Sequence, residues 1–281
     1  MRIGIFDSGL GGLIIAKAIR KIMPQYDYVY LGDTKRVPYG NRSHETVFEF
    51  TKQAVDYLFR KENCVIIIIA CNTASAQALK KIQQEYLLKN FPRQGRGEPD
   101  RKILGVLIPI AEECDKFKRV GILGTLGTIA SNSFPMEIKK ISKTIKIFQN
   151  SAPMLVPLAE EGEKILAKEF IVKYLKPFLG KKIEALVLGC THYPFYKNEI
   201  RKFLACPPKP WRRWGEKIKV LSQDEIIPKK LKDYLLRHPE IEKKLAKNRK
   251  AKILVTDITK NIVKLSKKWF GKNTKPELIK L

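Results

Sequence analysis

Four consecutive isoleucines at residues 66–69, followed by Ala-Cys-Asn-Thr-Ala-Ser at 70–75, constrain this chain's fold more than any other feature. An unbroken run of β-branched apolar residues is typical of a strand buried on both faces, as in parallel sheets. The small polar residues after it predict a turn into a helix, which places Cys71 at the carboxyl end of the strand. In open α/β sheets this edge binds ligands, and the following helix offers unpaired N–H groups there.

The same pattern recurs at residues 185–194, where Ala-Leu-Val-Leu-Gly precedes Cys-Thr-His-Tyr-Pro. Residues 119–128 also repeat the opening theme of strand, glycine turn and helix. These repeats predict an α/β fold of two similar domains with mainly parallel sheets.

Domain boundaries follow from composition. Proline, glycine and charged residues gather between residues 90 and 102, which indicates a loop or linker. We expect a discontinuous first domain, residues 1–92 plus 206–281, to which the tail returns. Residues 93–205 would form the second domain.

Cysteine usage and hydropathy bear on the compartment. The five cysteines are odd in number and widely spaced, unlike a disulfide framework, which favours a reducing cytoplasm. No apolar run approaches the length of a membrane span, and the first residues pass almost directly into a strand, so neither a signal peptide nor a membrane partner is expected.

The formal net charge of +27, from 55 Lys+Arg against 28 Asp+Glu, predicts long-range attraction to polyanions. The basic residues are spread along the chain between apolar residues at helical spacing, which is typical of solvated helix faces. Non-specific, charge-driven binding of nucleic acid therefore stays open, together with base stacking by the Trp-Arg-Arg-Trp stretch that begins at Trp211.

The glycine turn after the first strand does not fit a dinucleotide-binding loop. Counted from Gly9 and Gly11, the position that the fingerprint requires to be glycine or alanine is Ile14. The turn instead places Asp7 and Ser8 at the end of the strand, where Asp7 could equally cap a helix.

Metal binding is not expected. Cys190 and His192 have no further ligand at zinc spacing. Cys64, Cys114 and Cys206 lack the paired context and are interpreted as structural.

Four sequence motifs, taken in their order along the chain, resemble those of a known protein family. Phe-Asp-Ser-Gly-Leu-Gly-Gly at 6–12, Val-Pro-Tyr-Gly at 37–40 and the stretches around Cys71 and Cys190 closely resemble glutamate racemases of the aspartate/glutamate racemase superfamily. The resemblance covers nearly the whole chain. Its departures are the basic loop from Arg93 to Arg101 and the insert near Trp211.

The chemistry agrees with this resemblance, because racemising an amino acid requires one acid/base group on each side of the α-carbon. Two cysteines at matching strand ends can supply them. A free thiol titrates at about 8.5, and a helix N-terminus lowers that value. We expect both cysteines to open helices.

The resemblance implies an active site in the cleft between the two α/β domains and a role for each site residue. Cys71 would act on D-glutamate and Cys190 on L-glutamate, with Asp7 and His192 assisting them and Glu160 as a third assisting acid. Thr125 and Thr128 would close the site. The implied substrate contacts are Asp7, Ser8, Tyr39, Gly40, Asn72, Thr73, Thr191 and His192.

The resemblance further implies that no pyridoxal phosphate, flavin or metal is used, that the product D-glutamate supplies peptidoglycan, and that the chain forms a homo-oligomer, most simply a dimer. The alternatives are an aspartate racemase or related two-thiol isomerase and, third, a basic nucleic-acid-binding protein.

Overall fold

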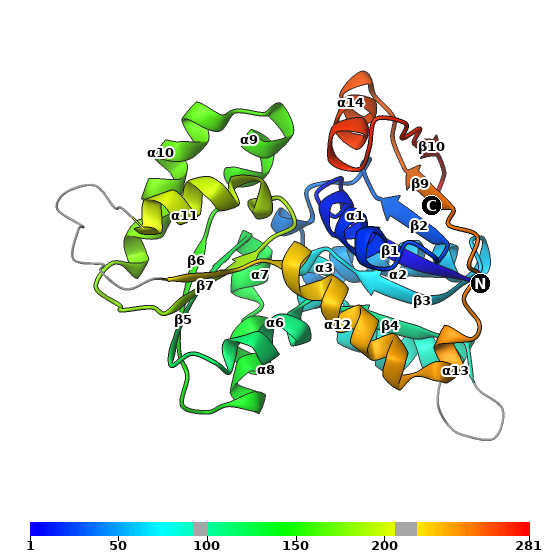
Figure 1. Cartoon of the computed structure of the whole chain (residues 1–281), viewed down its shortest axis with the longest axis horizontal. Helices are drawn as coiled ribbons and strands as arrows, with labels where there is room; N and C mark the ends of the chain where they lie inside the picture. The colour runs from blue at the N-terminus through cyan, green and yellow to red at the C-terminus, as the bar shows by residue number, and fades with distance from the viewer. Residues whose placement is uncertain (93–99, 206–217) are drawn as a thin grey trace. The chain divides into compact units, whose positions relative to one another are not determined.

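The computed structural model describes residues 1–92, 100–205 and 218–281. Contacts divide the chain into two compact units. The first comprises Met1–Val106 and Ile227–Leu281, and the second comprises Leu107–Ile226 (Figure 1).

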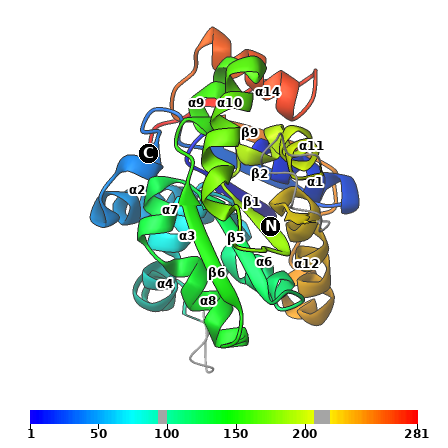
Figure 2. The same ribbon diagram turned by 90° about the vertical axis from the view of Figure 1, so that its left-hand side faces the viewer.

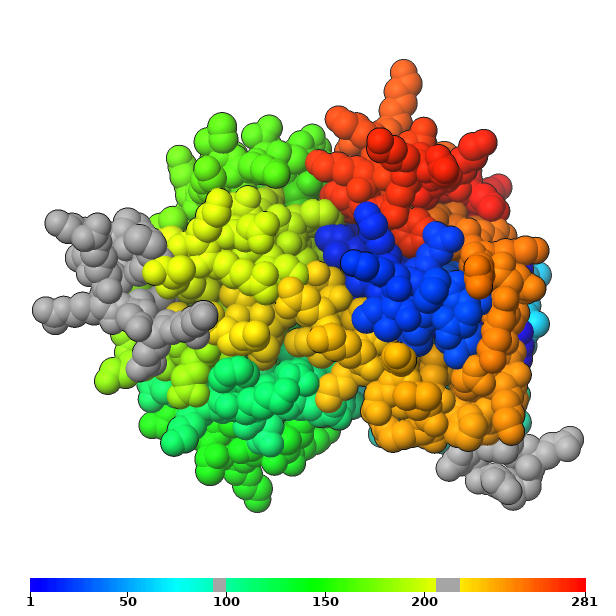
Figure 3. Space-filling model, in the orientation of Figure 1, coloured from blue at the N-terminus to red at the C-terminus, as the bar shows by residue number. Residues whose placement is uncertain are grey.

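A six-stranded, all-parallel sheet forms the centre of the first unit, with strand order β10-β9-β2-β1-β3-β4. Its strands are β1 (Arg2–Asp7), β2 (Tyr28–Gly32), β3 (Cys64–Ile69), β4 (Lys102–Gly105), β9 (Ala251–Val255) and β10 (Glu277–Leu278). Because β9 pairs with β2, the end of the chain completes the sheet that its beginning starts. In Figure 3 the blue N-terminal residues lie beside the orange and red C-terminal residues on this unit's surface.

Helices cover both faces of this sheet. They are α1 (Leu13–Ile22), α2 (His44–Arg60), α3 (Asn72–Gln77), α4 (Leu79–Lys81), α5 (Leu88–Asn90), α13 (Pro239–Glu242) and α14 (Lys260–Trp269), with 3₁₀ turn η1 (Tyr39–Asn41) and π-helical turn η2 (Ile82–Leu87). Helix α12 (Gln223–Arg237) leads from the second unit back into the first.

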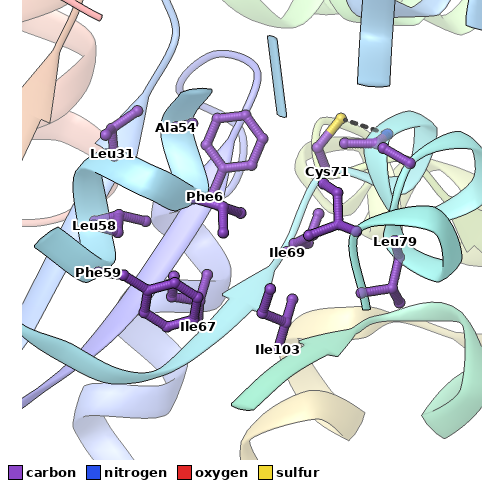
Figure 4. Close-up of a cluster of buried hydrophobic side chains, with 14 of the residues drawn as sticks. Phe6, Leu31, Ala54, Leu58, Phe59, Ile67, Ile69, Cys71, Leu79 and Ile103 are labelled. Atoms are coloured by element: carbon purple, nitrogen blue, oxygen red, sulfur yellow. Dashed lines mark hydrogen bonds between the residues drawn. The ribbon is translucent and has the colours of Figure 1, made fainter. Parts of the chain in front are cut away.

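The core explains why the isoleucine run forms a central strand. Side chains of a strand point alternately to its two faces, and Ile67 and Ile69 enter a cluster with Phe6, Leu58 and Phe59 (Figure 4). Ile66 and Ile68 point to the opposite face and are also buried. Since full burial of such a side chain contributes roughly 1.5–3 kcal/mol, the run is stable only where both faces are covered.

The second unit holds a four-stranded parallel sheet of order β6-β5-β7-β8. Its strands are β5 (Arg119–Gly124), β6 (Lys146–Ser151), β7 (Ala185–Gly189) and β8 (Lys219–Leu221). Its helices are α6 (Leu107–Cys114), α7 (Leu126–Ala130), α8 (Ser133–Ile141), α9 (Leu155–Glu161), α10 (Lys164–Leu175) and α11 (Lys197–Ala205), with 3₁₀ turns η3 (Lys176–Phe178) and η4 (Tyr193–Tyr196) (Figure 2).

The two sheets share one topology. In each, the chain runs from a central strand to a neighbour on one side and then crosses to the other side, as in β1-β2-β3 and β5-β6-β7. The strand order therefore reverses between β1 and β3, and between β5 and β7, which are the positions where open α/β sheets bind ligands. Cys71 follows β3 and Cys190 follows β7. The predicted α/β class, with two similar parallel-sheet units, is confirmed.

Two element boundaries are set locally. Strand β4 ends at Gly105, and helix α6 begins two residues later at Leu107. Helices α9 and α10 are separate, since Gly162 adopts a left-handed conformation (φ 80°) that ends α9.

Candidate active site

Cys71 caps the amino end of helix α3. Its Sγ accepts a hydrogen bond from the backbone N–H of Ala74 at 3.5 Å, the dashed line of Figure 4. The thiol also donates to Oγ of Ser8 at 3.3 Å. Backbone N–H groups at a helix start stabilise negative charge placed there. Cys71 therefore opens a helix as predicted, with partners for both its protonated and its ionised form.

Asp7 ends β1 and is fully buried. Its Oδ2 accepts hydrogen bonds from the N–H groups of Gly9 at 3.3 Å and Gly12 at 3.1 Å. A Cβ on Gly12 would lie 2.7 Å from the Cβ of Asp7, so glycine is required by this close approach. The Asp7 carboxylate thus stabilises the glycine turn ahead of α1. It is buried, and the next residue in the chain is Ser8.

Tyr39, another predicted substrate contact, is held by a polar cluster that sequence reasoning missed. Its hydroxyl donates to Oδ2 of the fully buried Asp33 at 2.5 Å, and Asp33 also accepts from Arg36 Nε at 2.6 Å and Thr256 Oγ1 at 2.7 Å. Burial and the Asp33 carboxylate raise the pKa of Tyr39, so its hydroxyl stays protonated. The sequence did contain a signal for Asp33, because Asp33, like Asp7, is an acidic residue at the carboxyl end of a buried strand.

The remaining predicted contacts of the first unit lie close by in the chain. Asn72 and Thr73 form the first turn of α3 and are 2% exposed. Gly40 lies in η1, next to Tyr39, and is partly exposed. The carboxyl edge of the sheet thus gathers Asp7, Ser8, Cys71 and the first turn of α3.

The second unit brings three predicted residues into one array. Cys190 Sγ lies 3.9 Å from Nδ1 of His192, and Nε2 of the same ring lies 3.0 Å from Oε1 of Glu160. Thr191 Oγ1 lies 3.5 Å from Nδ1 as well. Cys190 and His192 are buried, whereas the Glu160 side chain is 28% exposed.

The array fixes the protonation of His192. Burial disfavours the imidazolium, but hydrogen bonds and negative charge from Cys190 and Glu160 outweigh it and raise the pKa of His192 to about 10. At neutral pH both ring nitrogens therefore carry protons. One N–H faces the Cys190 sulfur and the other donates to Glu160.

Cys190 does not open a helix, contrary to prediction. The backbone N–H of Tyr193 bonds to the Cys190 carbonyl at 3.2 Å, which closes a turn, and η4 begins only at Tyr193. Pro194 in the first turn of η4 lacks an N–H, so it fits only a helix start at this point. A helix amino terminus can therefore stabilise a thiolate at Cys71 but not at Cys190. Beside Cys190, the neighbouring polar group is the His192 ring instead.

Thr125 and Thr128 form a cap at the end of β5. Thr125 Oγ1 accepts from the Thr128 N–H at 3.2 Å and donates to its hydroxyl at 2.9 Å. The cap starts α7 at the carboxyl edge where Cys190 also lies, since β5 and β7 are parallel neighbours.

The other cysteines differ from these two. Cys64 and Cys114 are fully buried free thiols, and burial raises the pKa of each to about 12. Cys206, Trp211 and the start of the basic loop at Arg93 lie outside the described residues.

No group of three or more His, Cys, Asp or Glu side chains suited to a metal ion occurs within residues 1–92, 100–205 and 218–281. In the same residues no helix is both long and apolar enough to cross a membrane.

Each of the two α/β units has a parallel sheet with a cysteine thiol after its third strand, and a thiol is a group that can give up or accept a proton. The chain belongs to the Asp/Glu/Hydantoin racemase family, whose profile matches residues 14–208. It is 36% identical to a glutamate racemase of Aquifex aeolicus over 283 residues, which cover 99% of this chain and 97% of that protein.

Solved structures agree. The crystal structure of Francisella tularensis glutamate racemase in complex with D-glutamate matches with a TM-score of 0.83 at 30% identity, covering 99% of this chain and 97% of that one. An aspartate racemase of Picrophilus torridus matches with a TM-score of 0.53 at 18% identity, over 86% of this chain and all of that one, which is a likeness of fold alone.

Proposed function

We propose that this chain is a cofactor-independent glutamate racemase that interconverts L-glutamate and D-glutamate through the thiols of Cys71 and Cys190. The observation that carries the proposal is the presence of one cysteine at the carboxyl end of the third strand in each unit. Family membership and relatives named glutamate racemase along nearly the whole chain support it.

The reaction divides into two proton transfers. With D-glutamate, the Cys71 thiolate removes the α-proton and becomes a thiol, and the C–H electron pair remains on the α-carbon. The Cys190 thiol then gives its proton to the opposite face, which leaves Cys190 as the thiolate and releases L-glutamate. The reverse reaction exchanges these roles, so the mechanism requires both thiols to reach one α-carbon.

Different groups would assist the two thiols. In the first unit, Ser8 Oγ accepts a hydrogen bond from the Cys71 thiol, and the Ala74 N–H supports the thiolate. In the second unit, the charged His192 stabilises the Cys190 thiolate, and Glu160 holds the ring in place. Asp7 would assist the first site through the turn that it fastens.

Substrate binding would depend on hydrogen bonds from short polar side chains and backbone groups. Asn72, Thr73 and Thr191 follow the two cysteines directly, and Tyr39 is held with its ring fixed by Asp33. Hydroxyls, amides and backbone N–H groups of this kind suit the two carboxylates of glutamate.

We further infer a cytoplasmic homodimer whose D-glutamate supplies peptidoglycan. The four described cysteines are free thiols, which suits a reducing compartment. Sedimentation equilibrium would measure the oligomeric state, and a monomer at every concentration would contradict the dimer.

Single replacements of the two thiols test the function. Cys71→Ser and Cys190→Ser should each abolish racemisation of both glutamate enantiomers, because an alcohol is a far poorer base than a thiol. Circular dichroism at 200–250 nm should show an unchanged fold. Cys114→Ser is the matched control and should keep full activity, because Cys114 is a buried core residue. Full activity in either of the first two variants would refute the two-thiol mechanism.

Substrate choice is tested with the same preparations. Both enantiomers of glutamate and of aspartate should be assayed on protein treated with chelator. Inversion of glutamate alone supports the proposal, whereas inversion of aspartate alone would establish the related racemase. No inversion of either, with salt-dependent retention on DNA, would favour the charge-driven binding function suggested by the net charge of +27.

A further inference from the structure

The hydroxyl of Tyr193 joins the carboxyl ends of two strands in the second unit. It donates towards the carbonyl of Gly124, the last residue of β5, and that of Ala152, just past β6, with both oxygens at 2.9 Å. Tyr193 is fully buried and directly follows His192 in the chain. It was not among the predicted site residues.

These bonds close a ring of contacts around the His192 array. Ala152 lies three residues before α9, and its carbonyl also accepts the N–H of Leu155, the first residue of that helix. Glu160, near the other end of α9, bonds His192. The segment carrying His192 and Tyr193 is thus attached to both ends of α9, by the phenol at the start and by the imidazole near the end.

We propose that Tyr193 is a positioning residue whose hydroxyl ties the His192 segment to the start of α9 and thereby keeps His192 in register with Glu160 and Cys190. The kinetic consequence rests on the proposed function, whereas the effect on His192 does not. Without the hydroxyl, the segment would lose its hydrogen bond to the start of α9 and would keep the His192–Glu160 bond near the other end.

The phenol remains a donor at every pH of interest. Burial, followed by the negative charge of Cys190, raises the pKa of Tyr193 well above 10. Its removal should not unfold the unit, because both carbonyls keep backbone partners. The Ala152 N–H bonds to the Gly124 carbonyl at 2.8 Å, and the Leu155 N–H bonds to the Ala152 carbonyl at 3.2 Å.

Tyr193→Phe tests the proposal, and the chain supplies a matched control in the same turn. Tyr196 is also buried, but its hydroxyl has no hydrogen-bond partner among the described residues. Tyr196→Phe therefore removes the same atom from η4 without breaking a bond. Thermal unfolding followed by circular dichroism should show that both variants are folded at the assay temperature.

The readout is the titration of His192 by NMR in protein labelled with ¹³C at histidine Cε1. The chain has only three histidines, and His44→Gln and His238→Gln assign the other two signals. Tyr193→Phe should lower the His192 midpoint by at least one pH unit and kcat for glutamate at least tenfold, with KM changed less than twofold. Tyr196→Phe should change none of these.

A double-mutant cycle with Glu160→Gln tests whether Tyr193 acts on His192 through the His192–Glu160 hydrogen bond. Once Glu160 no longer holds the ring, Tyr193→Phe should shift the His192 midpoint further by less than 0.3 pH unit. An unchanged midpoint in folded Tyr193→Phe, or equal shifts in both phenylalanine variants, would overturn the proposal. If the unaltered protein does not racemise glutamate, the proposed function fails, while the NMR midpoints still decide the role of Tyr193.

Discussion

Glu160→Gln should lower the pKa of His192 and move the alkaline limit of activity. Oε1 of Glu160 lies 3.0 Å from Nε2 of a ring that is 7% exposed, and the pKa of His192 is about 10. A hydrogen bond to a charged group contributes about 1.5–3 kcal/mol, and 1.36 kcal/mol corresponds to one pH unit. An amide of the same shape should therefore lower the pKa by roughly one to two pH units.

The sign of the pH effect follows from which form is stabilised. Glu160 favours protonated His192, so its contribution to folding is complete below pH 6.5 and is lost as the pH rises through about 10. In Glu160→Gln that loss should begin at lower pH. The same shift should appear in kcat/KM for L-glutamate, because the Cys190 thiolate loses its cationic partner when His192 deprotonates.

Two measurements give the result. The His192 signal is followed by NMR between pH 5 and 11, and kcat/KM is measured over the same range. Glu161→Gln is the matched control, since Glu161 is exposed at the end of α9 and should change neither quantity. A His192 midpoint near 6.5 in the unaltered protein, or one that Glu160→Gln leaves in place, would refute this electrostatic reasoning.

Two further predictions concern the thiols. Ser8→Ala removes the acceptor 3.3 Å from Cys71 Sγ and should lower kcat/KM about fivefold, from a bond of about 1 kcal/mol. The loss must be equal in both directions, because the two enantiomers are equally stable and the equilibrium constant is therefore one. Unequal losses would show a fault in the coupled assays, whereas an unchanged kcat/KM in Ser8→Ala would contradict a role for this hydrogen bond. Iodoacetamide at pH 8 should leave Cys64 and Cys114 unmodified in the native protein, because burial raises the pKa of both to about 12. Mass spectrometry of the alkylated protein checks this, and rapid labelling of either residue would contradict the buried environment.

The fold could be predicted well from the sequence because its signals are local. The isoleucine run predicts a strand buried on both faces, and the small residues after it predict the turn into a helix. The repeat of that pattern around Cys190 indicated the second sheet. What the local pattern did not contain was the ending of α9 at Gly162, which depends on a left-handed backbone conformation at a single residue.

The candidate site divides in the same way. Strand endings placed Cys71, Cys190 and Asp7 at sheet edges. The contact between His192 and Glu160 joins residues 32 apart, and that between Asp33 and Thr256 joins residues 223 apart. The hydrophobic periodicity of a sequence identifies helices and strands, but it carries no information on which distant residues come into contact. Glu160 was reached only through the family resemblance, and Asp33 was missed.

Deuterium incorporation tests the two-thiol mechanism most directly. L-glutamate is converted in deuterated water by chelator-treated protein, and both enantiomers are analysed within the first few per cent of reaction. Two separate thiols predict deuterium at the α-carbon of the D-glutamate product and none in the recovered L-glutamate, because the proton removed by one thiol is not the one returned by the other. Deuterium appearing equally fast in recovered substrate and product would mean that a single group serves both faces, and would contradict the assignment of Cys71 and Cys190 as a pair.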